Sequence, residues 1–227
     1  SKGHALVLDQ TTGALYRYEP KTEAAALTPF LTLPATEGGW MRIILLDENN
    51  ALAISKNDIV QVNLKEKKSA PLSIEPKSEV ADVAIWNKRL YRLAASGQIF
   101  RHDRSEEGYA KGVPWLKTAS VRDAKAIAID SAIYLLLADG GVKKFLSGRE
   151  QTFSLPPLDE PLASASRIRT FPEAEVVAIL DPGTGRIVFA NSSGKLLVQY
   201  ESHDLLVSAS DFAFDAENKT IYALSHK

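Results

Sequence analysis

The chain has 227 residues, of which 45% are hydrophobic and 24% are charged, and it contains no Cys. This apolar fraction excludes a disordered chain, and the absence of Cys excludes a disulfide scaffold. Lys and Arg (27) nearly balance Asp and Glu (28), so the charge indicates neither a nucleic-acid partner nor an anionic membrane. The longest apolar runs, such as Ile43–Leu46, are too short for a membrane-spanning helix, which needs about 20 residues.

A hairpin motif recurs along the chain. Its clearest copies are Val7–Tyr16 and Ile179–Val188, which share an apolar-Leu-Asp start and a Thr-Gly pair at the same spacing. Three looser copies lie between them, at Ile54–Val60, Leu93–Phe100 and Leu137–Val142. The five turn residues are at positions 13, 57, 97, 140 and 185, so the steps are 44, 40, 43 and 45 residues. Gly, Asn or Asp between alternating apolar runs predicts a β-hairpin, because these residues tolerate positive φ.

Further apolar runs surround the hairpins. One run precedes each hairpin after the first, and another follows the last; these runs are Arg42–Asp47, Ala81–Trp86, Ala126–Asp130, Arg167–Phe171 and Asp211–Asp215. Weaker runs, such as Lys195–Tyr200 and Gln151–Leu155, follow the hairpins. The module therefore consists of four short strands in about 44 residues, which predicts an all-β fold, a β-propeller of four-stranded blades.

The number of blades follows from the strand count. We interpret residues 1–227 as one propeller domain that belongs to a longer chain. His4–Asp9 and Thr220–Lys227 both match the second strand of a blade, so five periods are present together with a duplicated strand. Six blades are our prediction, and five blades closed by the two termini are the alternative. A β-sandwich would also contain many short strands, but it gives no reason for a fixed period.

Three segments carry a family resemblance: Ile133–Phe145, Ile179–Phe189 with Gly194–Tyr200, and Asp211–Tyr222. They resemble the propeller region of large bacterial proteins in which a PPM-type phosphatase-like domain precedes a membrane anchor. More broadly, they are similar to NHL-type sensor propellers. The resemblance implies a ligand-sensing or protein-binding module outside the cytoplasm, and it implies no phosphatase activity, because the metal-binding carboxylates of such a phosphatase do not occur in this sequence.

Motifs for catalysis or metal binding give no strong signal. The four His residues are far apart and have no zinc-site spacing. Asp139-Gly140-Gly141 is at a hairpin turn. Asp9 and Asp181 each precede a short loop, where a carboxylate can accept hydrogen bonds from the backbone amides of the turn. Neither a Walker loop nor a Gly-x-Ser-x-Gly motif occurs. We therefore expect no metal, no cofactor and no catalytic residue.

The first strand of each blade is the best place to look for a binding site, because these strands line the channel of a propeller. Our candidate ligand-binding residues at the channel mouth are Arg42, Asp82, Trp86, Lys125, Arg169, Asp211 and Trp40. Two alternatives remain open. The charged side chains could pair with one another, since buried charges need partners, and the Trp rings could cover the core.

The function that these observations favour is a non-catalytic propeller. It would serve as a ligand-sensing or protein-interaction domain of a larger, membrane-attached bacterial protein, outside the cytoplasm. We expect a monomer whose partner is a protein, peptide or glycan at one face, with no nucleic acid and no membrane insertion. The alternatives are a hydrolase or lactonase with a metal in the central channel, for which Asp82 and Asp211 are too few ligands, and a purely structural scaffold.

Overall fold

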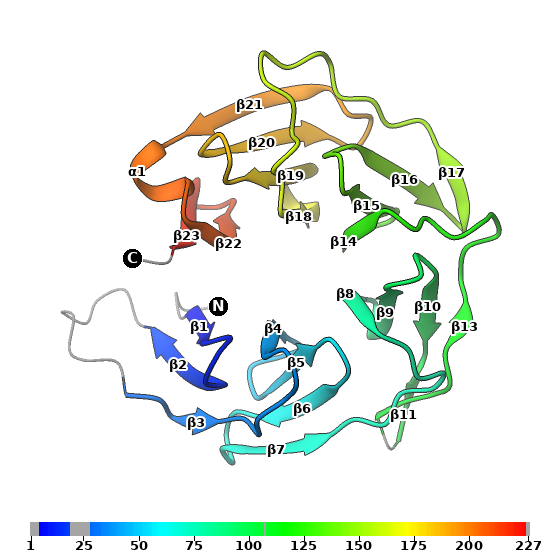
Figure 1. The fold of residues 1–227 in the computed structure, drawn as a ribbon, viewed down its shortest axis with the longest axis vertical. Helices are drawn as coiled ribbons and strands as arrows, with labels where there is room; N and C mark the ends of the chain where they lie inside the picture. Colours follow the sequence, from blue (N-terminus) through cyan, green and yellow to red (C-terminus); the bar gives the residue numbers. More distant parts are fainter. Residues whose placement is uncertain (1–4, 19–27, 107, 226–227) are drawn as a thin grey trace. The chain divides into compact units, whose positions relative to one another are not determined.

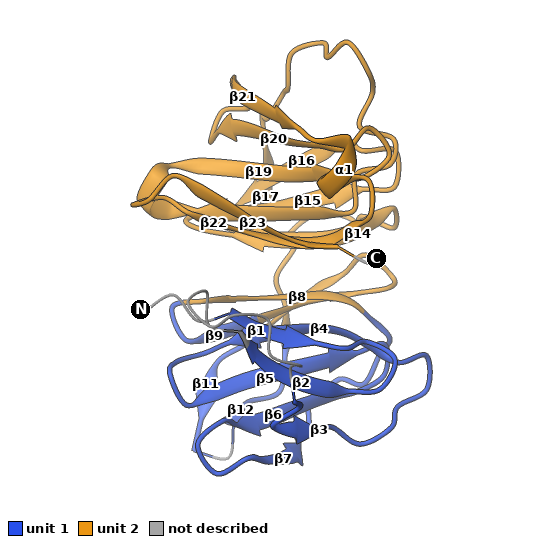
Figure 2. Cartoon of the chain, turned by 90° about the vertical axis from the view of Figure 1, so that its left-hand side faces the viewer, with its two compact units in different colours: residues 1–80, 87–90, 102–112 blue, residues 81–86, 91–101, 113–227 orange. Residues whose placement is uncertain are grey.

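The computed structural model describes residues 5–18, 28–106 and 108–225. The fold is a β-propeller built from antiparallel blades of up to four strands, as the repeat predicts (Figure 1). The described residues form two compact units, coloured separately in Figure 2. Unit 1 consists of residues 1–80, 87–90 and 102–112, and unit 2 consists of residues 81–86, 91–101 and 113–227. Within the described ranges, no helix is long and apolar enough to cross a membrane.

Unit 1 contains the first two sheets. The first sheet has three strands, which match the second to fourth strands of the repeat: β1 (Ala5–Leu8), β2 (Ala14–Tyr18) and β3 (Leu31–Thr32). The second sheet has all four strands: β4 (Trp40–Leu45), β5 (Asn50–Ser55), β6 (Ile59–Asn63) and β7 (Lys68–Pro71). Leu15, Val62 and their neighbours form one apolar core between these two sheets.

The third sheet has the order β13-β10-β9-β8. Its strands are β8 (Val80–Trp86), β9 (Arg89–Ala94), β10 (Ile99–His102) and β13 (Val113–Pro114). A small hairpin of β11 (Arg104–Ser105) and β12 (Gly108–Tyr109) is inserted before the fourth strand. This insertion places β13 later than a regular repeat would.

Three more sheets follow in unit 2, face to face in chain order (Figure 1). The fourth sheet contains β14 (Ala124–Ile129), β15 (Ile133–Leu137), β16 (Val142–Leu146) and β17 (Arg149–Gln151). The fifth contains β18 (Arg167–Phe171), the 3-10 helix η1 (Pro172–Ala174), β19 (Val176–Asp181), β20 (Arg186–Asn191) and β21 (Leu196–Glu201). Helix α1 (His203–Leu206) leads to the two-stranded sixth sheet, β22 (Ala209–Asp215) and β23 (Thr220–Ser225).

All five predicted hairpins are present at the expected turns. Four of the turn residues are Gly with positive φ: Gly13, Gly97, Gly140 and Gly185. Asn57 does not adopt positive φ; its turn is stabilised by the Ser55 hydroxyl, which accepts the Asp58 N–H at 2.9 Å. Apart from the inserted β11–β12 hairpin, the described ranges contain four complete sheets, one sheet of three strands and one of two, so both six and five blades remain compatible with the structure.

One fourth strand lies at a different place from the one that the sequence predicts. The run Gln151–Leu155 was expected as a fourth strand, but the strand is Arg149–Gln151, and Phe153 and Leu155 pack against the core beyond its end. The reason is that Phe153 and Leu155 pack against the core that the fourth and fifth sheets share, instead of continuing the ladder of the fourth sheet. The assignment of residues 1–227 to one domain of a longer chain stays a prediction.

Candidate functional site

The predicted binding residues lie on or beside the first strands, β4, β8, β14, β18 and β22. In three of these strands, the pairing with the second strand skips one residue at the same place: Met41, Lys125 or Ser210. The residues that follow these bulges, Arg42, Ala126 and Asp211, therefore occupy the same position of the repeat. Bulges re-aim side chains, so this position is suited to carrying a polar group out of the regular ladder.

Asp82 connects two neighbouring first strands. Its side chain is 8% exposed on β8, where Oδ1 accepts the Val83 N–H at 2.8 Å. Its Oδ2 accepts the Ile127 N–H of β14 at 3.0 Å. These two hydrogen bonds from backbone amides offset the cost of burying the carboxylate, and the second of them joins two sheets. The structure thus shows a packing role for Asp82.

Arg169 and Asp211 connect the next pair of sheets. The guanidinium Nη2 of Arg169 donates to both carboxylate oxygens of Asp211, at 2.6 and 2.5 Å, and Nε donates to Oδ1 at 3.2 Å. Asp211 also accepts the Phe212 N–H at 2.8 Å. Between these two cross-links, the Thr170 hydroxyl donates to the Ile129 carbonyl at 2.8 Å and so joins β18 to β14. The structure thus shows that Arg169 and Asp211 pair with each other, which is the alternative that the sequence left open for the charged candidates.

Lys125 is the bulged residue of β14. Its ammonium donates to the Ala138 carbonyl at 3.3 Å, at the β15–β16 turn of the same sheet. Burial lowers the pKa of the Lys125 ammonium, and the negative charges of Asp139 and Asp181 oppose that shift. Arg42 is partly buried on β4.

The two candidate Trp residues are placed differently from each other. Trp40 is only 4% exposed, belongs to the core of unit 1, and donates from Nε1 to the Pro34 carbonyl at 3.1 Å. The ring of Trp40 is therefore covered by the core, in agreement with the alternative in which it is a packing residue. Trp86 ends β8, as the sequence predicts, and packs partly against the core of unit 2. A ligand-binding role for Trp86 stays a prediction.

A buried ion pair that sequence reasoning missed lies at the β19–β20 turn. Asp181 is fully buried and accepts the Thr184 hydroxyl at 2.8 Å and Nη2 of Arg186 at 3.4 Å. We expected Asp181 to accept turn amides; Asp9 does so with Thr11 and Thr12, but the described contacts of Asp181 are the hydroxyl and the guanidinium. The signal was Arg186 itself, which stands where the matching first copy of the hairpin has Ala14.

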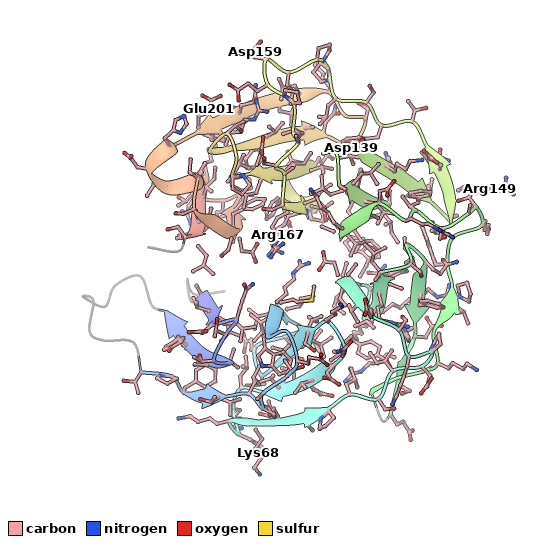
Figure 3. All side chains as sticks on the ribbon, in the orientation of Figure 1. Lys68, Asp139, Arg149, Asp159, Arg167 and Glu201 are labelled. Atoms are coloured by element: carbon pink, nitrogen blue, oxygen red, sulfur yellow. The ribbon has the colours of Figure 1, made fainter. Side chains whose placement is uncertain are left out.

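A shallow groove of about 450 Å³ runs beside the β15–β16 turn. It is lined by that turn, which includes Asp139, and by the connection from Phe153 to Leu162. Asp139 and Asp159, labelled in Figure 3, lie in the turn and in the connection. Asp139 accepts the Gly141 N–H at 2.8 Å, which confirms a hairpin turn for Asp139-Gly140-Gly141. In the described part of the chain, no group of three or more His, Asp or Glu side chains is arranged to hold a metal ion.

Exposed apolar side chains gather at the end of unit 2. Seven of the ten large apolar residues exposed in the described ranges lie between positions 197 and 224. Five of these form what we call the β21–α1 surface: Leu197 (50% exposed), Val198 (39%), Tyr200 (47%), Leu205 (56%) and Val207 (47%). Both segments lie beside the β19–β20 turn. Val207 lies next to Gly185, since a Cβ on that glycine would be 3.0 Å from the Val207 side chain, and Tyr200 pairs with Ile187 just after the turn.

Comparisons with known proteins identify the fold and nothing finer. No family model and no curated protein matches the chain. The computationally designed protein Ika8 is similar over 100% of this chain and 69% of its own, with a TM-score of 0.57 and 15% identity. BamB from Moraxella catarrhalis is similar over 99% of this chain and 65% of its own, with the same TM-score and identity.

A protein of unknown function from Bacteroides thetaiotaomicron is similar over 70% of this chain and 42% of its own, with a TM-score of 0.55 and 13% identity. The chain thus spans about two thirds of the length of the first two structures and less of the third. At these identities the likeness supports the propeller fold, while the resemblance to PPM-associated and NHL-type propellers stays a prediction.

Proposed function

We propose that this chain is a non-catalytic propeller module that binds another protein through the β21–α1 surface. The observation that carries this proposal is the clustering of five large apolar side chains, each 39% or more exposed, on one part of unit 2. Large apolar side chains that are exposed near one another on a protein surface often mark a site where a partner binds. Tyr is also enriched among residues that anchor protein interfaces.

The polar residues of the first strands support the same proposal. A hydrolase of the lactonase type needs several ligands that converge on one metal ion. Asp82 is bound to the amides of Val83 and Ile127, and Asp211 is bound to Arg169. These carboxylates stabilise the junctions between sheets, so the apolar surface is the better candidate for recognition.

The cellular setting belongs to the proposal as well. We place the module outside the cytoplasm, as the sensing or interaction part of a larger membrane-attached bacterial protein. Support comes from the sequence resemblance and from the absence of Cys, which is compatible with an exported domain. Fractionation of source cells with an antibody against the chain tests this placement; recovery in the cytoplasmic fraction would contradict it.

Site-specific photo-crosslinking tests the binding function. A photoreactive amino acid is introduced at Leu205 in the full chain expressed in source cells, with Leu146 on β16 as the control position, because Leu146 is 47% exposed but lies on another sheet. We expect a discrete protein adduct from position 205, its loss when Val198→Glu is added, and none from position 146. Equal labelling at both positions, or none at either, would overturn the proposal.

A further inference from the structure

The connection between the fourth and fifth sheets is longer than its counterparts. In the described part of the chain, the connections from a fourth strand to the next first strand are residues 33–39, 72–79, 115–123, 152–166 and 202–208. Four of them have 7 to 9 residues, whereas the connection 152–166 has 15. Because the shorter connections join their sheets equally well, the extra length is not needed for the fold. Long connections inside a compact domain are usually functional.

The extra residues lie between two points at which backbone contacts fix this connection. Near its start, Ser154 passes against the β20–β21 turn, because a Cβ on Gly194 would overlap the Ser154 backbone. Near its end, Leu162 lies against the β15–β16 turn, because a Cβ on Gly140 would overlap the Leu162 carbonyl. Residues 155–161 lie between the two points, and we call these seven residues the inserted segment.

The preceding connection has corresponding contacts but a shorter span between them. The Lys117 N–H donates to the Gly148 carbonyl at 2.8 Å, and the Val121 N–H donates to the Gly97 carbonyl at 3.0 Å. Residues 118–120 lie between these two points, so three residues there correspond to seven in the later connection. The inserted segment is therefore an addition to the repeat and not a part of every blade.

Side chains hold the inserted segment at both ends. At its C-terminal end, Nη2 of Arg186 donates to the carbonyls of Glu160 and Pro161, at 2.5 and 3.4 Å. Before its N-terminal end, the Phe153 ring packs edge-on against Tyr134, with ring centroids 5.5 Å apart. A surface that is already fixed loses less conformational entropy when it binds a partner.

The groove beside the β15–β16 turn lies between that turn and the inserted segment. Its volume of about 450 Å³ falls within the range of about 300–1,000 Å³ that is usual for ligand sites. Four of its apolar side chains are only partly buried: Val142, Phe153, Leu155 and Leu158. The groove belongs entirely to unit 2 and to the junction of the fourth and fifth sheets, both of which are complete.

The charge around the groove is negative. Of the described residues that line it, Asp139 alone is charged. Asp159 and Glu160 are exposed in the inserted segment, and Figure 3 labels Asp139 and Asp159. The Lys125 ammonium, which donates to the Ala138 carbonyl at 3.3 Å, offsets at most one of these three negative charges. An occupant with positive charge and apolar side chains therefore matches the groove.

We propose that this groove binds an extended segment of another protein in which apolar and basic side chains alternate. Successive side chains of an extended segment point to opposite sides, so the apolar ones pack on Phe153 and Leu158 while the Lys or Arg side chains reach Asp139 and Asp159. A shallow groove covers one side of such a segment, whereas a small-molecule site encloses most of its ligand. This site is separate from the β21–α1 surface, so the inference goes beyond the proposed function.

Titration of the isotope-labelled 227-residue chain with a synthetic peptide tests the proposal. The probe has about nine residues in which Leu and Arg alternate, an extended length of about 30 Å. We expect saturable changes in the amide chemical shifts of Gly140–Val142 and of residues 154–160, and weaker binding in about 0.5 M salt. Two control peptides, with Glu in place of Arg or Ser in place of Leu, should bind at least about tenfold more weakly.

Charge variants of the protein test the same contacts. Asp139→Asn and Asp159→Asn each remove one negative charge, and the first keeps an oxygen that can accept the Gly141 N–H. Each should weaken binding of the Leu-Arg peptide about twofold to fivefold, as expected for exposed ion pairs. Asp204→Asn, at an exposed position on α1, is the matched control and should leave binding unchanged.

Several results would overturn the proposal. Equal binding of the three peptides would do so, as would shift changes centred on the β21–α1 surface, or no saturable binding up to about 1 mM peptide. Shift changes at the groove when the chain alone is concentrated, together with a dimer in sedimentation, would assign the groove to a second copy and overturn a separate partner. Crosslinking from Leu205 tests the proposed function independently, so the failure of one is distinguishable from the failure of the other.

Discussion

Replacement of Gly97 by Ala tests how the blades are connected. Gly97 has φ of +82° at the β9–β10 turn, and its carbonyl accepts the Val121 N–H at 3.0 Å from the segment that leads to the next blade. A Cβ at this position would overlap the Val121 carbonyl and lie 2.6 Å from the Arg122 nitrogen. All three contacts involve backbone, which cannot move aside as a flexible side chain can.

The expected destabilisation adds three effects. A left-handed conformation disfavours Ala by about 1–2 kcal/mol, overpacking costs about 1–3 kcal/mol, and a weakened hydrogen bond costs about 1 kcal/mol. We therefore expect Gly97→Ala to lower the free energy of unfolding by about 3–6 kcal/mol, which corresponds to a decrease in Tm of about 6–24 °C for a chain of this size.

Gly38→Ala is the matched control. Gly38 has a similar φ of +78°, but a Cβ there would meet no atom within 4 Å. This variant isolates the effect of backbone conformation, about 1–2 kcal/mol. Denaturant unfolding followed by circular dichroism measures both variants. An equal effect at the two positions would refute the close approach of residues 121 and 122 to the turn.

Three further perturbations follow from the packing and the charges of unit 2. Phe145→Ala removes a fully buried ring and should lower the free energy of unfolding by about 3–5 kcal/mol, whereas Leu146→Ala, at an exposed position, should change it by less than about 0.5 kcal/mol in the same denaturant titration. A double-mutant cycle with Arg169→Met and Asp211→Asn should give a coupling of about 1–2 kcal/mol, because the bidentate pair is only partly exposed. Burial raises the pKa of Tyr134 to about 12, so absorbance at high pH should show a late tyrosine transition that Tyr134→Phe removes. Because the folded state favours the neutral phenol, the contribution of Tyr134 to the free energy of unfolding decreases as pH rises from about 10 towards 12.

Each of these three predictions has a result that would contradict it. Similar effects of the changes at positions 145 and 146 would contradict the core assignment of Phe145. A coupling near zero would show that Arg169 and Asp211 do not interact in solution. Completion of all tyrosine ionisation near the ordinary pKa, with the fold intact, would contradict the burial of Tyr134.

The hairpin pattern could be predicted from the sequence because turns and strand alternation are short-range properties. Gly97 and Gly140 adopt positive φ as the repeat predicts, and the pairs Leu8–Leu15 and Ile54–Ile59 enclose the expected turns. The insertion of β11 and β12 was not predicted, since it changes the spacing after a hairpin without changing the hairpin itself.

The site was harder to predict, because a polar residue on a first strand looks the same whether it binds a ligand or a neighbouring strand. Asp82 bonds to Ile127, 45 residues away, and Arg169 to Asp211, 42 residues away, which is one repeat in each case. The repeat length thus placed these residues on successive blades. Which of them would pair was not encoded in the spacing.

The sequence by itself determined the blade, its period and its turns, because these depend on local backbone preference and on the alternation of apolar side chains. The tertiary structure alone decided that Asp82, Arg169 and Asp211 join adjacent sheets, that Trp40 is buried, and which apolar residues of β21 and α1 stay exposed. These outcomes depend on which face of a sheet meets another element. Such contacts form between residues about one blade or more apart in the sequence. The alternation of side chains along one strand does not tell which residue of another blade each of them will contact.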